Sequence, residues 1–181
     1  MIYMFLADGF EETEAIETLD ILRRAGLPVQ TVGVGGRLRT GAHGVPVRCD
    51  REENELDLSS LEGVILPGGM PGTVNLKESE SVKKTVEYAA ESGKLVAAIC
   101  AAPMVLGSLG LLKGRYATIY PGMESHLAGA ACEKHVVVWD GNLITSQGPG
   151  TAMIFALAIV DALCGQEMGD RIAEELILPH E

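Results

Sequence analysis

Short apolar segments that alternate with amphipathic ones constrain the fold of this chain most strongly. Residues 2–6 form a continuous apolar run, as in strands that are buried on both faces of a sheet. Residues 11–24 then carry apolar side chains at helical spacing, with acidic residues early and arginines late, which suits the helix dipole. Repetition of this alternation along the chain predicts one α/β domain, a doubly wound sandwich with a mostly parallel sheet.

The remaining elements follow from the same patterns. Further strands are predicted at residues 29–34, 64–66, 94–99, 117–120, 135–139 and 143–146. Helices are predicted at residues 79–92, from residue 100 through Leu109, and from Pro149, because proline is favoured at the first helical position. Residues 37–49 have the composition of a small β-hairpin excursion. Since the chain contains no linker or repeat, residues 1–181 are predicted to form a single domain.

Composition excludes several classes of partner. The 14 basic and 25 acidic residues give a net charge of −11, whereas nucleic acids and anionic membranes require basic surfaces. The N-terminal apolar run, residues 2–7, is too short for a signal-peptide core, and the longest later run, residues 151–163, is too short to span a bilayer. The cysteines, Cys49, Cys100, Cys132 and Cys164, show neither the spacing of a disulfide framework nor that of a zinc site. We therefore expect a cytoplasmic protein without a metal or other cofactor.

Cys100 is the strongest candidate for a reactive residue. It ends the predicted strand at residues 94–99, and alanines follow it where a helix begins. A sharp strand-to-helix turn exposes its central side chain, and the helix N-terminus stabilises a thiolate there. A buried, inert cysteine is the alternative interpretation.

Two other strand ends can meet Cys100, because ligands of such sheets bind at the carboxyl ends of the strands. The turn at Gly68 and Gly69 is either a cradle of backbone amides for a developing oxyanion or simply a tight turn. Glu14 lies among three acidic residues that begin a helix, where such residues are usually solvated partners of the dipole. Its position just before an apolar pair allows it to point inward instead.

Four motifs together resemble the ThiJ/PfpI superfamily, most closely the branch of the parkinsonism-associated protein called DJ-one. They are GFEETE at residues 9–14, LPGG at 66–69, AAICAAP at 97–103 and TSQGPGT at 145–151. They occur in the family's order and span essentially the whole chain. The resemblance implies a flavodoxin-like fold, usually in a homodimer, with the cysteine of the strand-to-helix turn as nucleophile and redox centre.

The resemblance also assigns roles to individual residues. Cys100 matches the reactive cysteine, and Glu14 matches a protonated glutamate that hydrogen-bonds its sulfur. The backbone N–H groups that line an oxyanion or sulfinate pocket belong to Gly68, Gly69 and Ala101. The residues near the dimer contact are Arg24, Pro149 and Cys49. Physical chemistry agrees in part, because a partly desolvated carboxyl group beside a thiolate should have a raised pKa.

Two positions depart from the patterns of related branches. Protease-like members place a histidine directly after the cysteine, where this chain has Ala101, so peptidase activity is disfavoured. Some close relatives carry a proposed histidine base where this chain has Tyr120, which is a poor base at neutral pH. His43, in the hairpin excursion, is a candidate accessory residue that could approach a neighbouring subunit's site.

The resemblance leaves two functions open. One is a glutathione-independent glyoxalase or protein deglycase that acts on a small α-oxoaldehyde or a glycated substrate through the Cys100 thiolate and Glu14. The other is an oxidation-sensing, chaperone-like homodimer in which Cys100 forms a sulfinate without turnover. Neither requires a cofactor.

Overall fold

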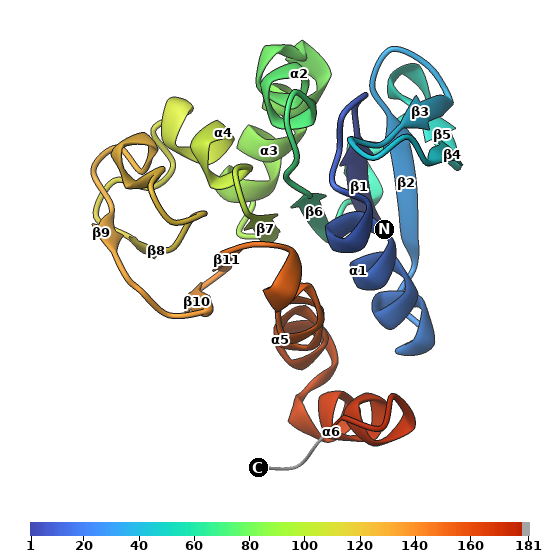
Figure 1. The fold of residues 1–181 in the computed structure, drawn as a ribbon, viewed down its shortest axis with the longest axis vertical. Helices are drawn as coiled ribbons and strands as arrows, with labels where there is room; N and C mark the ends of the chain where they lie inside the picture. The colour runs from blue at the N-terminus through green and yellow to red at the C-terminus, as the bar shows by residue number, and fades with distance from the viewer. Residues whose placement is uncertain (179–181) are drawn as a thin grey trace.

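A computed structural model of the protein describes residues 1–178; residues 179–181 of the predicted domain lie outside the described residues. Its centre is a seven-stranded sheet with the order β10-β11-β7-β6-β1-β2-β5 (Figure 1). The paired strands run parallel, except that β10 is antiparallel to β11. The strands of this sheet are β1 (Ile2–Leu6), β2 (Val29–Gly33), β5 (Arg51–Glu52), β6 (Gly63–Leu66), β7 (Leu95–Ile99), β10 (Val137–Asp140) and β11 (Leu143–Ser146).

Helices cover both faces of the sheet, as the apolar strands predict. One face packs against α1 (Glu12–Arg24), α5 (Ala152–Cys164) and α6 (Gln166–Glu175). The other packs against α2 (Gly72–Glu78), α3 (Glu80–Glu91) and α4 (Pro103–Ser108) (Figure 1). Within β1, Met4 and Phe5 join the cores on opposite faces, because successive side chains of a strand point in opposite directions.

Two short sheets and four 3₁₀ turns complete the elements of residues 1–178. The predicted hairpin excursion is confirmed as the antiparallel pair β3 (Leu38–Thr40) and β4 (Pro46–Arg48). β8 (Tyr116–Ala117) pairs with β9 (Ala131–Cys132). The 3₁₀ turns are η1 (Glu53–Glu55), η2 (Leu58–Ser60), η3 (Glu124–His126) and η4 (Pro149–Thr151).

Some boundaries differ from the sequence predictions. The strand predicted at residues 117–120 is wrong in extent, because β8 ends at Ala117 and lies outside the main sheet. After Ala117 the backbone makes no ladder bond at Thr118, whose N–H donates to the side-chain Oγ1 of Thr145 in β11 at 2.9 Å rather than to a backbone carbonyl. The helix predicted from Pro149 begins as the 3₁₀ turn η4 and continues as α5. The short helices α2 and α6 were not predicted.

The topology brings the candidate residues to one edge of the sheet. The chain winds from β1 to β2 on one side of β1, whereas β6 and then β7 lie on the other side. The winding therefore reverses between β1 and β6, which is where ligands bind in open α/β sheets. The segments that follow β1, β6 and β7 contain Glu14, Gly68 and Cys100, respectively.

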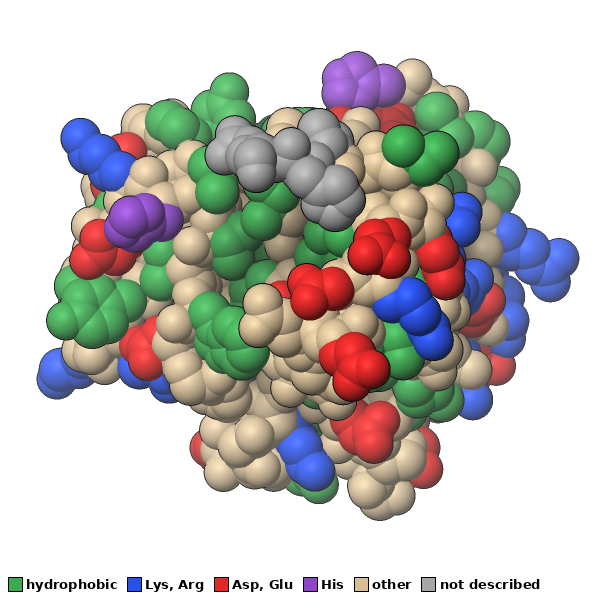
Figure 2. Space-filling model, turned by 90° about the horizontal axis from the view of Figure 1, so that it is seen from below, with side chains coloured by type: hydrophobic (Ala, Val, Ile, Leu, Met, Phe, Trp, Pro, Cys, Tyr) green, Lys and Arg blue, Asp and Glu red, His purple; other side chains and the backbone are tan. Residues whose placement is uncertain are grey.

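Two further features bear on the class of partner. No helix within residues 1–178 is long and apolar enough to cross a membrane. Figure 2 shows several acidic side chains grouped on the face that is seen from below, as the net charge of −11 leads one to expect. Lys or Arg side chains lie beside this group, so the face carries both signs of charge (Figure 2).

Candidate active site

Cys100 occupies the strained turn between β7 and α4. Its φ of 63° lies in the left-handed region, which is uncommon for residues other than glycine and is found mostly where the surrounding structure enforces it. Two neighbouring segments hold its backbone: Cys100 N–H donates to the Ser146 carbonyl oxygen at 2.9 Å, and Tyr120 N–H donates to the Cys100 carbonyl oxygen at 2.9 Å. The side chain is nearly enclosed, with the residue 9% exposed. The predicted strand-to-helix turn is therefore present, although it buries the thiol more than we expected.

Glu14 points inward from the first turn of α1 and is 1% exposed. Its Oε2 accepts a hydrogen bond from Gly68 N–H at 2.7 Å, while its Oε1 is buried without a hydrogen-bond partner among residues 1–178. Burial raises the pKa of Glu14 to about 7, although interactions with Cys100 and Gly68 oppose the rise. An unpartnered oxygen in a desolvated site favours the neutral acid, so the raised pKa has a clear structural cause. The predicted direction of this pKa shift is confirmed.

The protonation state predicted for Cys100 is wrong. Burial, and next the charge of Glu14, raise the pKa of the Cys100 thiol to about 12. The N–H groups of Gly69 and Ala101 hydrogen-bond the sulfur and lower this pKa, but they do not outweigh desolvation. The sequence argument counted the helix N-terminus and omitted burial, which favours the neutral thiol. At neutral pH the resting site therefore contains a thiol beside a carboxyl group that is about half ionised.

The glycine turn after β6 allows Cys100 and Glu14 to approach each other. A Cβ atom on Gly68 would lie 2.6 Å from the Cys100 Cβ and 2.7 Å from Glu14 Oε2. Gly69 has a φ of +90°, and a Cβ there would lie 2.4 Å from the backbone nitrogen of Glu11. The turn is therefore tight, as one of the two interpretations predicts. Its role as a cradle for an oxyanion stays a prediction.

The turn differs from the prediction in one detail. Gly68, Gly69 and Ala101 were all predicted to line an oxyanion pocket. The Gly68 N–H instead binds Glu14, whereas those of Gly69 and Ala101 hydrogen-bond the Cys100 sulfur. A pocket for an oxyanion or a sulfinate would thus be built on Gly69 and Ala101.

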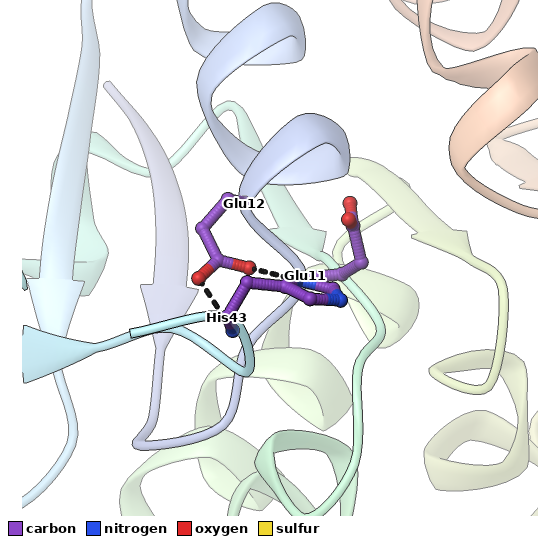
Figure 3. A group of neighbouring side chains, drawn as sticks. All are labelled: Glu11, Glu12 and His43. Carbon is purple, nitrogen blue, oxygen red and sulfur yellow. Dashed lines mark hydrogen bonds and ion pairs between the residues drawn. The ribbon is translucent and has the colours of Figure 1, made fainter. Parts of the chain in front are cut away.

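The predicted accessory residues lie in different surroundings. Tyr120 is 48% exposed and its ring lies beside Gly148, on which a Cβ would be 3.4 Å from Tyr120 Cδ2. His43 lies in the hairpin between β3 and β4, and its Nδ1 is 2.9 Å from Glu12 Oε2 (Figure 3). This hydrogen bond raises the pKa of the His43 imidazole.

Glu11 is a site residue that the sequence analysis missed. Its carboxylate caps α1 by accepting a hydrogen bond from Glu14 N–H at 2.7 Å, and its charge contributes to the raised pKa of Glu14. An acidic residue directly before the predicted helix was the available signal, but helix-start acids are usually solvated. Glu11, Glu12 and His43 also form a group whose ligand atoms could hold a metal ion.

The residues predicted near a dimer contact lie at three separate places in the chain. Arg24 ends α1 and forms an ion pair with Asp20 at 2.7 Å, and Pro149 begins η4. Cys49 follows β4 and is 2% exposed, and burial raises the pKa of its thiol to about 11. Their role in a dimer stays a prediction.

Comparisons with known proteins agree with the motifs. The model of the DJ-1/PfpI family matches residues 1–162. Protein dj-1beta of Drosophila melanogaster is 39% identical over 187 residues, which cover 98% of this chain and 96% of that protein. A deglycase of Pyrococcus abyssi is 35% identical over 155 residues, which cover 82% of this chain and 90% of that protein. The crystal structure of a mutant DJ-1 superfamily protein from Salmonella typhimurium gives a TM-score of 0.94 at 36% identity, covering 99% of this chain and 98% of that one. The resemblance and the fold class predicted from the sequence are confirmed.

Proposed function

We propose, since the chain belongs to the DJ-1/PfpI family, that it is a cysteine-dependent enzyme that converts methylglyoxal or releases it from glycated adducts. The main support is the contact between the Cys100 thiol and the Glu14 carboxyl group, whose pKa of about 7 makes it an effective base near neutral pH. The similarity to a protein named as a deglycase supports the same class of substrate. This activity needs no cofactor.

The proposed first step is addition of Cys100 to the aldehyde. The Glu14 carboxylate takes the thiol proton while the sulfur–carbon bond forms and the carbonyl π bond breaks, which gives a hemithioacetal oxyanion. The N–H groups of Gly69 and Ala101 lie where they can stabilise this anion. Glu14 then returns the proton to the oxygen. A buried thiol can therefore act as the nucleophile without being a resting thiolate.

The next steps move one proton between two carbon atoms and one between two oxygen atoms. The Glu14 carboxylate removes the proton of the former aldehyde carbon, and the electron pair shifts onto the ketone oxygen to give an enediolate. Glu14 returns this proton to the adjacent carbon, and the hydroxyl proton on the former aldehyde oxygen moves to the former ketone oxygen, which gives a lactoyl thioester on Cys100. Water hydrolyses the thioester, which releases lactate and restores the thiol, so methylglyoxal and one water molecule together account for the product.

Lactate production from methylglyoxal tests the proposal. We expect Cys100→Ala to reduce the rate by about a thousandfold or more, because it removes the nucleophile. Cys132→Ala, at an exposed cysteine in β9, should leave the rate within about twofold and is the matched control. A panel of α-oxoaldehydes and glycated amines then identifies the substrate. Equal rates for the wild type and Cys100→Ala would contradict the mechanism.

Oxidation sensing is a second candidate, favoured by the same polar groups around the sulfur. The N–H groups of Gly69 and Ala101 could bind the oxygens of a sulfinate, and a protonated Glu14 could donate to one of them. We expect the yield of Cys100 sulfinate under mild peroxide to fall from wild type to Glu14→Gln to Glu14→Leu, as measured by mass spectrometry. A sensor of this kind would show negligible lactate formation together with an oxidation-dependent change in client binding or dimer stability.

We also propose that the protein acts in the cytoplasm as a symmetric homodimer that includes Arg24, Pro149 and Cys49 at or near the contact. The absence of cysteine spacing typical of disulfides supports the compartment. Sedimentation at micromolar concentration tests the assembly, and a monomer there would contradict it.

A further inference from the structure

Glu11, Glu12 and His43 converge from two segments that are distant in sequence. The two glutamates lie at the start of α1, whereas His43 lies in the hairpin between β3 and β4 (Figure 3). Each side chain offers one ligand atom, and the three atoms lie within 4.8 Å of one another. Ligands that bind one Zn²⁺ ion at about 2.0–2.2 Å are separated by roughly 3–4 Å, so small side-chain rotations would complete such a geometry.

The position of Glu12 is fixed by the hairpin. Its Oε1 accepts a hydrogen bond from His43 N–H at 2.7 Å, and its side chain is only 13% exposed. Gly41 makes room for the carboxylate, since a Cβ atom there would lie 2.2 Å from Glu12 Oε1. The hairpin backbone thus packs closely around one carboxylate of the group, which limits the reorganisation needed to bind a ligand.

Of the other two side chains, Glu11 is held in place by a hydrogen bond and His43 is accessible to solvent. Glu11 is restrained because its Oε2 accepts the hydrogen bond from Glu14 N–H at 2.7 Å. His43 is 73% exposed, so its ring can be reached from solvent, while Nδ1 lies 2.9 Å from Glu12 Oε2. A metal ion could therefore replace the proton between these two atoms and bind both of them.

We propose that Glu11, Glu12 and His43 form a binding site for a divalent transition-metal ion of the Zn²⁺ class. One imidazole and two carboxylates are typical Zn²⁺ ligands, whereas Mg²⁺ and Ca²⁺ prefer oxygen alone. Three protein ligands leave a coordination position for water or a small anion. The site shares no reacting group with the proposed enzymatic activity, which uses Cys100 and Glu14, although the charge of Glu11 also contributes to the raised pKa of Glu14.

Isothermal titration with Zn²⁺ tests the site. The parent protein should carry Cys100→Ala, Cys132→Ala and Cys164→Ala, because these thiols could bind Zn²⁺ themselves. We expect one Zn²⁺ per chain with micromolar or tighter affinity. His43→Ala and, separately, Glu12→Gln should each weaken binding by at least about tenfold.

His135→Ala is the matched control, since His135 is also exposed and lies 4.0 Å from a single carboxylate, that of Glu133. It should leave the affinity unchanged. Circular dichroism without metal checks that each variant is folded, and Co²⁺ absorption should show nitrogen and oxygen ligands without a thiolate-to-metal band. The proposal is overturned if the parent binds no stoichiometric Zn²⁺, if His43→Ala binds it as tightly as the parent, or if Co²⁺ reports a thiolate.

Discussion

Cys100 and Cys49 are both buried cysteines whose thiols are difficult to ionise, yet their surroundings differ. Burial raises the pKa of Cys100 to about 12 and that of Cys49 to about 11. Cys49 has a hydroxyl neighbour, Thr31, and is affected by the charge of Asp50, whose pKa is lowered. Cys100 instead lies beside the carboxyl group of Glu14, whose pKa is about 7. Neither burial nor thiol pKa therefore distinguishes Cys100, the proposed nucleophile, from Cys49. The proposed distinction is a neighbouring carboxyl group that can act as a base near neutral pH.

The backbone sharpens the same contrast. Cys100 has a φ of 63° at the end of a central strand and faces the N–H groups of Gly69 and Ala101. Cys49 follows the peripheral hairpin and packs against the backbone near Gly33, where a Cβ would lie 3.2 Å from its sulfur. Of these two regions, the one around Cys100 combines a strained backbone, N–H donors and a carboxyl group with a pKa of about 7, which is why we propose the chemistry there.

Removal of the Glu14 carboxyl group should have the largest effect, a fall in the rate of lactate formation. Glu14→Leu should lower lactate formation from methylglyoxal by about a thousandfold, because it removes the proton acceptor from Cys100. Thr31→Val removes the polar neighbour of Cys49 and should leave the rate within about twofold. If Glu14→Leu retained more than a tenth of the wild-type rate, the distinction between the two cysteines would fail.

The buried carboxyl group of Glu14 should also reduce the free energy of unfolding at high pH. The pKa of Glu14 is raised from 4.5 to about 7, so the folded state binds its proton more tightly. This contribution to stability is present below pH 4.5 and is lost as the pH rises through 7. Glu14→Gln should therefore raise the free energy of unfolding at pH 8 by about 3 kcal/mol relative to wild type, with little difference near pH 4.

Urea denaturation at both pH values measures this difference. Glu87→Gln, at an exposed position of α3, is the control and should change stability equally at the two pH values. Equal stabilities of wild type and Glu14→Gln at pH 8 would show that the buried carboxyl group carries no such cost.

The glycine turn offers a test of close packing in the Cys100 region. Gly68→Ala should cost about 2 kcal/mol of stability and reduce turnover, because its Cβ would collide with Cys100 and Glu14. Gly150→Ala is the matched control, since a Cβ there meets nothing within 4 Å. Equal stability and turnover of the two variants would show that Gly68 is not needed to bring the pair together.

The smallest expected effect is a difference in how steeply the alkylation rates of Cys100 and Cys49 rise with pH. Below pH 7 the rate of Cys100 alkylation should rise by about tenfold per pH unit as Glu14 ionises, and it should level off above pH 7. The Cys49 rate should continue to rise beyond pH 9, because it follows thiolate formation with a pKa of about 11. Mass spectrometry after brief iodoacetamide treatment resolves the two. The same pH dependence of alkylation for both cysteines would contradict the role of Glu14 as a base.

Local pattern predicted the elements that have strong local signals. The apolar run of β1 and the charge order of α1 were sufficient, because both elements bury a continuous or periodic apolar face. The strand predicted at residues 117–120 was too long, because the apolar run continues beyond Ala117, where the pairing of β8 with β9 ends. The proposed metal site of Glu11, Glu12 and His43 could not be predicted from local patterns for a different reason. Glu12 and His43 lie 31 positions apart and meet only because the hairpin folds over the start of α1.

Local sequence patterns were enough to predict the parallel α/β fold and to place Cys100 and Gly68 at strand ends, because apolar periodicity and turn residues act over a few positions. The protonation states and hydrogen-bond partners at those strand ends depend instead on the tertiary structure. Burial depends on everything packed around a group, and here it turned a predicted thiolate into a thiol and gave Glu14 a pKa of about 7. It also directed the Gly68 N–H to Glu14, a contact between residues 54 positions apart that no local pattern encodes.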